Sequence, residues 1–244
     1  MDVPRTVTAA LDDRPVDGRR CLEAGAGVGN TTAELLASGA SRVYAVTNDR
    51  EHAETTHDRI HDGARSTDNN RLVVLEADLR AIPLPDDSID LLTAHGLCNL
   101  LDPAALLTIA DEFRRVAAPG CHLVINDYDP LPADATVGDL FAVENAASEL
   151  ARGRPALTFY PAPFLQRFFQ GDGWALDREQ TLLDPVPWTA SHLAAHATWT
   201  RSLAADCPMG LGDRMSAAAG QLATDIGSES AGRMYSLAFR TPGR

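Results

Sequence analysis

The feature that most constrains this chain is a glycine-rich stretch over residues 21–30, with the sequence CLEAGAGVGN. It predicts the end of a buried strand, then a tight turn, then a helix that runs to about Gly39. Glycines at such a turn allow backbone conformations that other residues avoid, and they let a ligand approach where a Cβ atom would block it. The helix start presents backbone N–H groups without intrahelical partners. The stretch therefore predicts a ligand-binding turn between a strand and a helix.

The spacing of the glycines separates two classes of ligand. A dinucleotide turn requires G-x-G-x-x-G, and the third glycine of that spacing falls on Asn30. The pattern present is Glu23-x-Gly25-x-Gly27-x-Gly29. The carboxylate of Glu23 would repel a pyrophosphate, whereas it suits a ligand that carries an ammonium and a sulfonium. The turn therefore disfavours an NAD-type ligand.

Apolar strands alternate with helical segments along the chain, which predicts an α/β fold. We expect a Rossmann-like, doubly wound, mostly parallel seven-stranded sheet, covered by helices on both faces. Ligands of such folds bind beyond the carboxyl ends of the strands. The expected strands are 19–24, 42–47, 71–76, 89–94, 121–126, 174–183 and 234–241. The expected helices are 7–11, 31–39, 50–64, 102–116, 133–152, 164–171, 190–205 and 214–226.

Four ordered segments resemble motifs of the class I S-adenosylmethionine-dependent methyltransferases, of the methyltransferase-11 type. Residues 23–29 resemble motif I of this family, and residues 76–90 resemble its Gly-Asp-Ala…Leu-Pro-Phe…Asp-x-Ser-Phe-Asp segment. Residues 115–125 resemble Leu-Arg-Pro-Gly-Gly-x-Leu, and residues 164–174 resemble the Phe-Leu…Ala-Gly-Phe helix before strand six. The match is good over 20–127 and loose elsewhere. It implies S-adenosylmethionine as cofactor, S-adenosylhomocysteine as product, and a small-molecule substrate methylated at an O, N or C atom.

The resemblance also implies which residues would hold the cofactor. Asp78 would accept a hydrogen bond from the adenine amine, next to Leu79. The family places a ribose-binding acid at the end of the second strand, where this chain has Thr47, so Asn48 or Asp49 would have to substitute. The complete set of expected cofactor contacts is Glu23, Gly25, Ala26, Gly27, Gly29, Asn30, Thr47, Asn48, Asp78, Leu79 and His95.

The break in alternation after Tyr128 predicts helical insertions at about 129–160 and 185–230. We expect residues 1–244 to form a single class I methyltransferase domain with a cofactor-binding core over 15–127. The two insertions would form a helical lid that supplies substrate contacts.

Methyl transfer from a sulfonium is an in-line displacement, so the protein mainly positions the nucleophile and excludes water. His95 follows the fourth strand and is the candidate general base by position and ordinary pKa; the alternative is a histidine hydrogen-bonded at a strand end. Asp127 and Tyr128 end the fifth strand and would bind or deprotonate the substrate. The pairs His57/His61 and His192/His196 have the i, i+4 spacing of metal ligands but lack the glutamate of H-E-x-x-H, so no metal site is expected.

Composition limits the partners. The net charge is −13 and every cationic side chain is arginine, which predicts a halophilic archaeal origin, because the Debye length falls to about 3 Å in molar salt; an arginine-rich, GC-rich genome is the alternative. No basic stripe supports nucleic-acid binding. No membrane insertion is expected without an apolar run of about eighteen residues. The scattered cysteines and the N-terminus predict a cytoplasmic protein. The oligomeric state stays open, a homodimer included.

Three other functions were weighed. A non-catalytic S-adenosylmethionine-binding sensor or partner subunit is suggested by Thr47 in place of the usual acid. An NAD(P)-dependent oxidoreductase is disfavoured by Glu23 and Asn30. A nucleic-acid methyltransferase is disfavoured by the acidic charge.

Overall fold

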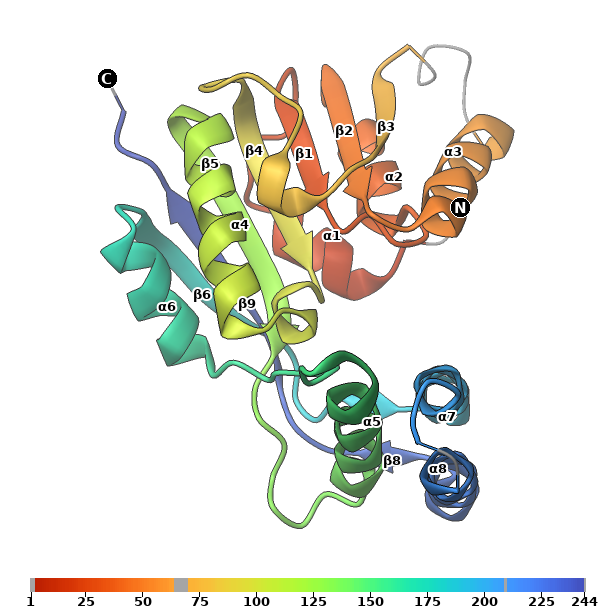
Figure 1. Ribbon diagram of the computed structural model, residues 1–244. Coiled ribbons are helices and arrows are strands. Elements are labelled where there is room, and N and C mark those ends of the chain that lie inside the picture. The colour runs from red at the N-terminus through yellow and green to blue at the C-terminus, as the bar shows by residue number, and fades with distance from the viewer. Residues whose placement is uncertain (1–2, 64–69, 209, 244) are drawn as a thin grey trace.

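The computed structural model describes residues 3–63, 70–208 and 210–243. Seven strands form one sheet in the order β3-β2-β1-β4-β5-β9-β6, in which β9 runs antiparallel to both of its neighbours and the other pairings are parallel (Figure 1). The sheet strands are β1 (Arg20–Ala24), β2 (Arg42–Thr47), β3 (Leu72–Glu76), β4 (Ile89–His95), β5 (Ala117–Tyr128), β6 (Ala175–Leu183) and β9 (Met234–Arg240). The expected Rossmann-like, mostly parallel seven-stranded fold is confirmed.

Helices cover both faces of the sheet, and two separate apolar cores show which helix lies on which face. The first core joins α4 and α6 to alternate strand residues such as Leu92 and Leu123. The second core joins α1, α2 and α3 to the strand residues that alternate with those of the first core, such as Leu91 and Val124. The helices are α1 (Arg5–Leu11), α2 (Asn30–Ala37), α3 (Arg50–Gly63), α4 (Pro103–Val116), α5 (Val137–Arg152), α6 (Ala162–Gly171), α7 (Ala190–Ala204) and α8 (Leu211–Ile226).

Most expected boundaries are confirmed within three residues, and the exceptions have local causes. The fifth strand begins at Ala117, four residues early, because Ala117 pairs with Ile89 before an irregularity in the register. Helix α5 begins at Val137 and not at residue 133. Single 3-10 turns, η1 (Leu79–Ala81) and η2 (Cys98–Leu100), follow β3 and β4 and were not expected. The expected end of α3 at Ala64 lies outside the described residues.

A helical part made of α5, α7 and α8 lies beyond the carboxyl ends of the strands (Figure 1). It has an apolar core of its own, which includes Phe141 and Trp188, and a short ribbon of β7 (Pro187–Trp188) and β8 (Glu229–Ser230). Thr189 begins α7 with a capping box, because its hydroxyl accepts from the backbone N–H of His192. The segments 129–160 and 185–230 therefore pack together at the edge where ligands of this fold bind. Over the described residues, no helix is both long and apolar enough to cross a membrane.

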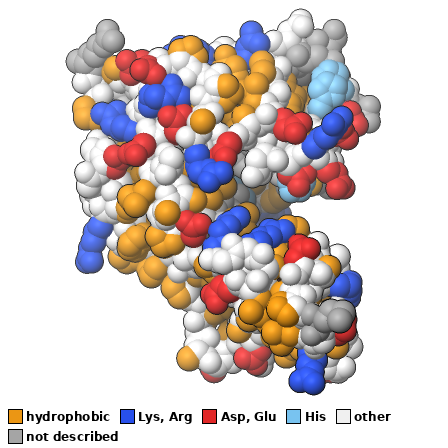
Figure 2. Space-filling model, in the orientation of Figure 1, with side chains coloured by type: hydrophobic (Ala, Val, Ile, Leu, Met, Phe, Trp, Pro, Cys, Tyr) orange, Lys and Arg blue, Asp and Glu red, His pale blue; other side chains and the backbone are white. Residues whose placement is uncertain are grey.

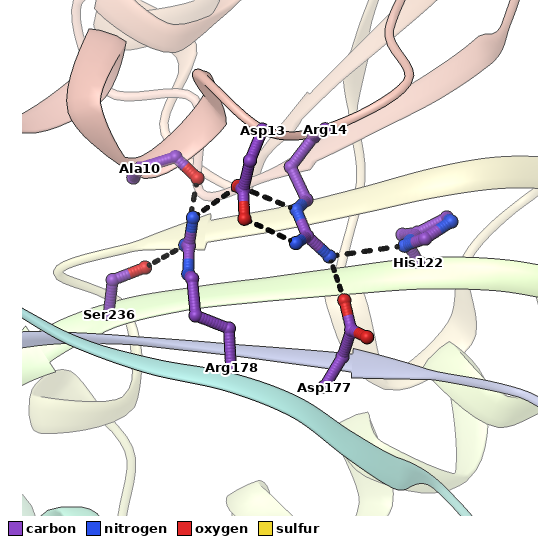
Figure 3. A network of polar contacts seen from close by, with 7 residues as sticks. All are labelled: Ala10, Asp13, Arg14, His122, Asp177, Arg178 and Ser236. Atoms are coloured by element: carbon purple, nitrogen blue, oxygen red, sulfur yellow. Dashed lines mark hydrogen bonds and ion pairs between the residues drawn. The ribbon is translucent and has the colours of Figure 1, made fainter.

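Arg14, just after α1, ties the N-terminal segment to the sheet (Figure 3). Its side chain is only 6% exposed and forms ion pairs with Asp13 and with Asp177 of β6. Its Nη1 also lies 3.3 Å from Nδ1 of His122 in β5. Because arginine is always charged and donates only, the two carboxylates and the imidazole nitrogen must act as acceptors.

Arg178 of β6 completes this network from the sheet side (Figure 3). Its Nη2 donates to the carbonyl of Ala10 at 3.0 Å and to the hydroxyl of Ser236 in β9 at 2.8 Å, and its Nη1 donates to Asp13. The network thus crosses from α1 to β6 and β9, and it fixes the helix against the antiparallel end of the sheet.

We expect Arg14→Met to lower the free energy of unfolding by about 1–3 kcal/mol at neutral pH, because hydrogen bonds to charged groups contribute that much. Hydrogen bonds from Arg14 are the largest cause that lowers the pKa of Asp13 and of Asp177. Carboxylates with lowered pKa stabilise the fold above their unfolded pKa, and this stabilisation is lost as the pH falls through the folded pKa. The loss of stability on acidification should therefore be shallower in the variant, as measured by chemical denaturation from about pH 7 to about pH 3.

The control is Arg5→Met, because the exposed side chain of Arg5 makes no hydrogen bond or ion pair within the described part of the chain. Equal stability of Arg14→Met and this control at every pH would contradict the role of the network.

Candidate functional site

The three glycines of the turn all have left-handed backbone conformations, with φ of 76° at Gly25, 53° at Gly27 and 77° at Gly29. Two of them are also required by packing. A Cβ at Gly25 would lie 3.2 Å from Cδ1 of Leu97, and one at Gly29 would lie 3.1 Å from Cγ2 of Thr56. A Cβ at Gly27 would meet nothing closer than a carbonyl oxygen at 4.0 Å. The turn therefore presents open space above Gly27, a cradle that a side chain would fill.

Neighbouring elements hold the turn from the side away from this space. The backbone N–H of Ala26, a buried residue, donates to the carbonyl of Val46 in β2 at 3.0 Å. The hydroxyl of Thr56 in α3 donates to the carbonyl of Gly27 at 3.0 Å. Asn30 is half-buried and begins α2. The conformation of the turn is thus fixed by β2 and α3 without any ligand.

Glu23 ends up beneath the turn, 3% exposed, with its carboxylate accepting a hydrogen bond from the hydroxyl of Thr32 in α2. Burial raises the pKa of Glu23 to about 7, although hydrogen bonds from Thr32 and Thr31 oppose the shift. A buried carboxyl of this kind ionises more readily when a cation binds beside it. Its position is compatible with the expected ammonium contact.

The end of β2 commits two of the three candidate ribose residues to local structure. The hydroxyl of Thr47, a buried side chain, accepts from the backbone N–H of Asp49 at 3.2 Å. Oδ1 of Asp49 accepts from the N–H of His52 at 3.0 Å and so caps α3. Asn48 is exposed, and its side chain makes no hydrogen bond within the described residues. Asn48 is therefore the residue here with a free polar side chain.

The end of β3 carries an ion pair that was not predicted from the sequence. Asp78 is exposed, and its carboxylate binds the guanidinium of Arg80, with 2.6 Å between Oδ2 and Nη2. Oδ1 also accepts from the backbone N–H of Arg80, and Asp78 thereby caps η1. The pKa of Asp78 is lowered mainly by this arginine. The side chain of Leu79 points into the core. An adenine amine bound by Asp78 would have to share the carboxylate with the guanidinium of Arg80.

The ends of β4 and β5 bring His95 against Asn126, a residue that the sequence analysis did not single out. Nδ1 of His95 lies 3.1 Å from Nδ2 of Asn126. Burial lowers the pKa of His95 to about 4, so the ring is neutral at physiological pH. Gly96 follows with φ of 61°, and a Cβ there would meet nothing within 4 Å. Open space therefore lies beside His95 as well as above Gly27.

Asp127 and Tyr128 lie at the same edge of the sheet, where backbone N–H groups hold the carboxylate of Asp127. Asp127 is 1% exposed; its Oδ2 accepts from the N–H of Asn99 at 3.1 Å and its Oδ1 from the N–H of Tyr128 at 2.9 Å. Burial raises the pKa of Asp127 to about 7 and that of Tyr128 to about 12. The ring of Tyr128 packs 5.5 Å from that of Trp188, centroid to centroid, and so joins the sheet edge to the helical part.

The histidine pairs have local partners. The rings of His57 and His61 stack at 3.8 Å on the exposed face of α3. His192 belongs to the capping box of α7, and Nδ1 of His196 lies 2.7 Å from the buried carboxylate of Glu144 in α5. Among residues 3–63, 70–208 and 210–243, no group of three metal-binding side chains is placed to hold an ion.

A hollow separates the sheet and its covering helices from the helical part in the space-filling view (Figure 2). It lies at the end of the molecule where the carboxyl ends of the parallel strands meet the helical part. A separate groove of about 380 Å³ lies between α5 and α8, lined by Ala142, Val143, Ala146, Arg214, Met215 and Ala218. That groove holds none of the expected site residues.

Residues 22–125 match the family model described as "Methyltransferase domain". These residues include the glycine turn and the ends of β1 to β4. Over these residues the chain is therefore similar to a methyltransferase domain.

A curated relative supports the same family. The chain is 34% identical over 120 residues to a demethylmenaquinone methyltransferase of Clavibacter sepedonicus, which covers 48% of this chain and 44% of that protein. The chain thus spans less than half the length of this relative.

Solved structures show the fold over almost the whole chain. A Bacillus halodurans protein described as a methyltransferase has a TM-score of 0.66 at 14% identity and covers 97% of this chain and 98% of its own. The [4+2]-cyclase SpnF has a TM-score of 0.66 at 18% identity, over 98% and 81% of the chains. Geranyl diphosphate C-methyltransferase of Streptomyces coelicolor, solved with S-adenosylhomocysteine, has 0.61 at 14%, over 96% and 76%. Since one of these proteins is named a cyclase, the fold alone does not fix the reaction.

We expect Glu23→Gln to gain stability relative to the wild type as the pH rises from about 4.5 to about 7. The folded pKa of Glu23 is raised, so the wild type loses stability over this window, because the unfolded chain ionises while the folded chain resists; glutamine has no such loss. The difference should grow by up to about 3 kcal/mol, as measured by chemical denaturation across the window.

Glu34→Gln, on the same helix α2 as Thr32, is the matched control and should follow the wild type. If the difference for Glu23→Gln stays constant with pH, the burial of this carboxyl does not govern its ionisation.

Proposed function

We propose that this chain binds S-adenosylmethionine at the carboxyl ends of β1, β2, β3 and β4 and transfers its methyl group to a small molecule, with S-adenosylhomocysteine as product. The observation that carries the proposal is the open space at Gly27, in a turn that directly follows the buried carboxyl of Glu23 in β1. A narrow cradle of this kind admits a ligand to the backbone, and the neighbouring carboxyl favours a cation. The match of residues 22–125 to a methyltransferase domain supports the assignment.

The residues present fit such a cofactor at each of its parts. The turn from Gly25 to Gly29 would accommodate the amino-acid end, and Glu23 would favour its ammonium. Asn48 would contact the ribose with its free amide, and Asp78 would accept from the adenine amine. The cofactor supplies an activated methyl group on sulfur, so the chain itself has to orient the acceptor and exclude water.

The helical part would close over the substrate, as a lid formed by about 129–160 and 185–230 on a core of 15–127. Support comes from the hollow in Figure 2 and from the contact of Tyr128 with Trp188, which places the apolar core of the helical part beside the sheet edge. The name of the Clavibacter relative favours a small-molecule acceptor. The composition supports a cytoplasmic protein of a halophile.

A second candidate is a binder of the same cofactor that does not transfer methyl groups. The end of β2 favours it, because Thr47 and Asp49 are held by local hydrogen bonds where an acid would bind the ribose. The cyclase SpnF shows that a protein with this fold can carry another name and reaction.

The test is calorimetric titration with S-adenosylmethionine, S-adenosylhomocysteine and NAD, at low salt and in molar KCl, followed by a methyl-transfer assay on a panel of small molecules. We expect binding of the two sulfur ligands and not of NAD, because Glu23 opposes a pyrophosphate. Binding without transfer to any acceptor would favour the non-catalytic binder, and binding of NAD or of no ligand would contradict the proposal.

We expect Gly27→Val to abolish binding of S-adenosylhomocysteine, because its side chain would enter the open space above the turn. The left-handed conformation adds strain of about 1–2 kcal/mol, so a control must carry the same strain. Gly18→Val provides it, since Gly18 has φ of 72° and nothing within 4 Å of an added Cβ, yet precedes β1 at the opposite edge. Retained micromolar affinity in Gly27→Val, or an equal loss in Gly18→Val, would contradict the pocket.

A further inference from the structure

The side chain of Asn126 determines which nitrogen of His95 carries the proton. The amide nitrogen Nδ2 of Asn126 can only donate, and it lies 3.1 Å from Nδ1 of His95. Nδ1 must therefore accept, so the proton of the neutral ring resides on Nε2. Nε2 is the ring nitrogen farther from the backbone; the ring is half-buried, and an added Cβ at the next residue, Gly96, would meet nothing within 4 Å.

The backbone around Asn126 holds this contact rigidly. Asn126 is 2% exposed and pairs with His95 of β4 on one side and Ser236 of β9 on the other. Its carbonyl accepts from the N–H of Gly96 at 2.7 Å. The amide oxygen Oδ1 is buried without a hydrogen-bond partner within the described residues, so the one interaction that this side chain makes is the contact with His95.

The other candidate bases at the strand ends are committed elsewhere. Both carboxylate oxygens of Asp127 accept from backbone N–H groups. Burial raises the pKa of the Tyr128 hydroxyl to about 12 and lowers the pKa of His95 to about 4, so both groups are neutral hydrogen-bond donors at neutral pH. Of these two donors, the N–H of His95 is the one whose position on the ring is set by a neighbouring side chain, Asn126.

We propose that Asn126 is a positioning residue that holds His95 in the Nε2–H form, and that His95 thereby donates a hydrogen bond to an anionic oxygen of the substrate, such as a phenolate or an enolate. This proposal rests on the proposed methyl transfer. An electron pair of the substrate anion would form the bond to the methyl carbon, while the S–C bond breaks and its electron pair stays on sulfur. When oxygen is the acceptor, the anion would become a neutral, methylated oxygen and the sulfonium a neutral thioether. The protein would take up no proton.

The first test is the ring proton itself, read without any ligand. In the full chain labelled with ¹⁵N-histidine, long-range ¹H–¹⁵N correlation distinguishes the protonated from the bare ring nitrogen, and His95→Gln assigns the signals. We expect the Nε2–H form for His95. His122 serves as the internal reference, since Nη1 of Arg14 donates to its Nδ1 and imposes the same form. A proton on Nδ1 of wild-type His95 would overturn the proposal, because the amide would then present its oxygen.

Asn126→Asp is the matched variant. At a pH high enough to ionise the introduced carboxyl, the carboxylate only accepts, so Nδ1 of His95 must become protonated in the variant, while the signals of His122 stay unchanged. Unchanged nitrogen signals of His95 in a folded variant would overturn the positioning role. The wild-type spectrum decides the tautomer even if this variant fails to fold.

The second test addresses the substrate class with two probes that share a ring and differ in charge, benzoate and benzylamine. In protein saturated with S-adenosylhomocysteine, we expect benzoate to shift the Nε2–H signal of His95 saturably, and benzylamine to leave it in place. Absence of a shift with benzoate, or a shift with benzylamine alone, would overturn the oxyanion role. Failure of S-adenosylhomocysteine to bind would contradict the proposed function instead, and the tautomer in ligand-free protein is measured independently of that result.

Discussion

The contact on which the site depends is a pair of backbone hydrogen bonds at the end of β2. The N–H groups of Gly25 and Ala26 both donate to the carbonyl of Val46, at 2.9 and 3.0 Å. They fold the chain sharply after β1, and this fold is sterically accessible because Gly25 has a positive φ. With the inner side of the turn bound to β2 and α3, the outer side at Gly27 is left facing open space. The cradle is thus a consequence of how two parallel strands are joined.

The parallel half of the sheet could be predicted from the sequence because its information is local. Each buried strand is a short apolar run, and α4 begins at a polar cap, Asp102, whose carboxylate accepts from the N–H of Ala105. The glycine turn could be predicted for the same reason. A capping Asp or Asn, the spacing of glycines and the period of apolar residues each specify structure within a few residues of themselves.

The chemistry at the strand ends could not be predicted in the same way, because it depends on partners far apart in the chain. His95 and Asn126 are 31 residues apart and meet through the register of β4 with β5. The hydroxyl that binds Glu23 belongs to Thr32, and it reaches the carboxylate because α2 packs back over β1. The position of His95 predicts a base or a strand-end hydrogen bond, and the tautomer of its ring depends on the amide of Asn126 beside it. A strand-end residue type shows where chemistry can occur, and the register decides which chemistry.

The absence of lysine from the sequence has a counterpart in how the arginines are used. The guanidinium of Arg115 binds the carboxylates of Glu112 and Asp86 and also donates to the carbonyls of Leu84 and Ile82. A planar group with five donors can join several acceptors at once, which an ammonium on a flexible stem does less well. Arg14 and Arg178 act in the same way between α1 and the sheet. Few cations in an acidic chain therefore serve many acceptors.

The place of β9 in the sheet bears on the order in which the molecule can form. β9 is the last strand of the sheet in sequence, yet it lies between β5 and β6, and within the described residues β6 pairs with β9 alone. During synthesis the β3-β2-β1-β4-β5 portion can assemble early, while β6 remains without a pairing partner until β9 has been made. Asn126 likewise lacks its neighbour Ser236 until then. A growing chain can therefore form the glycine turn and the contact of His95 with Asn126 before β5 acquires its second neighbour.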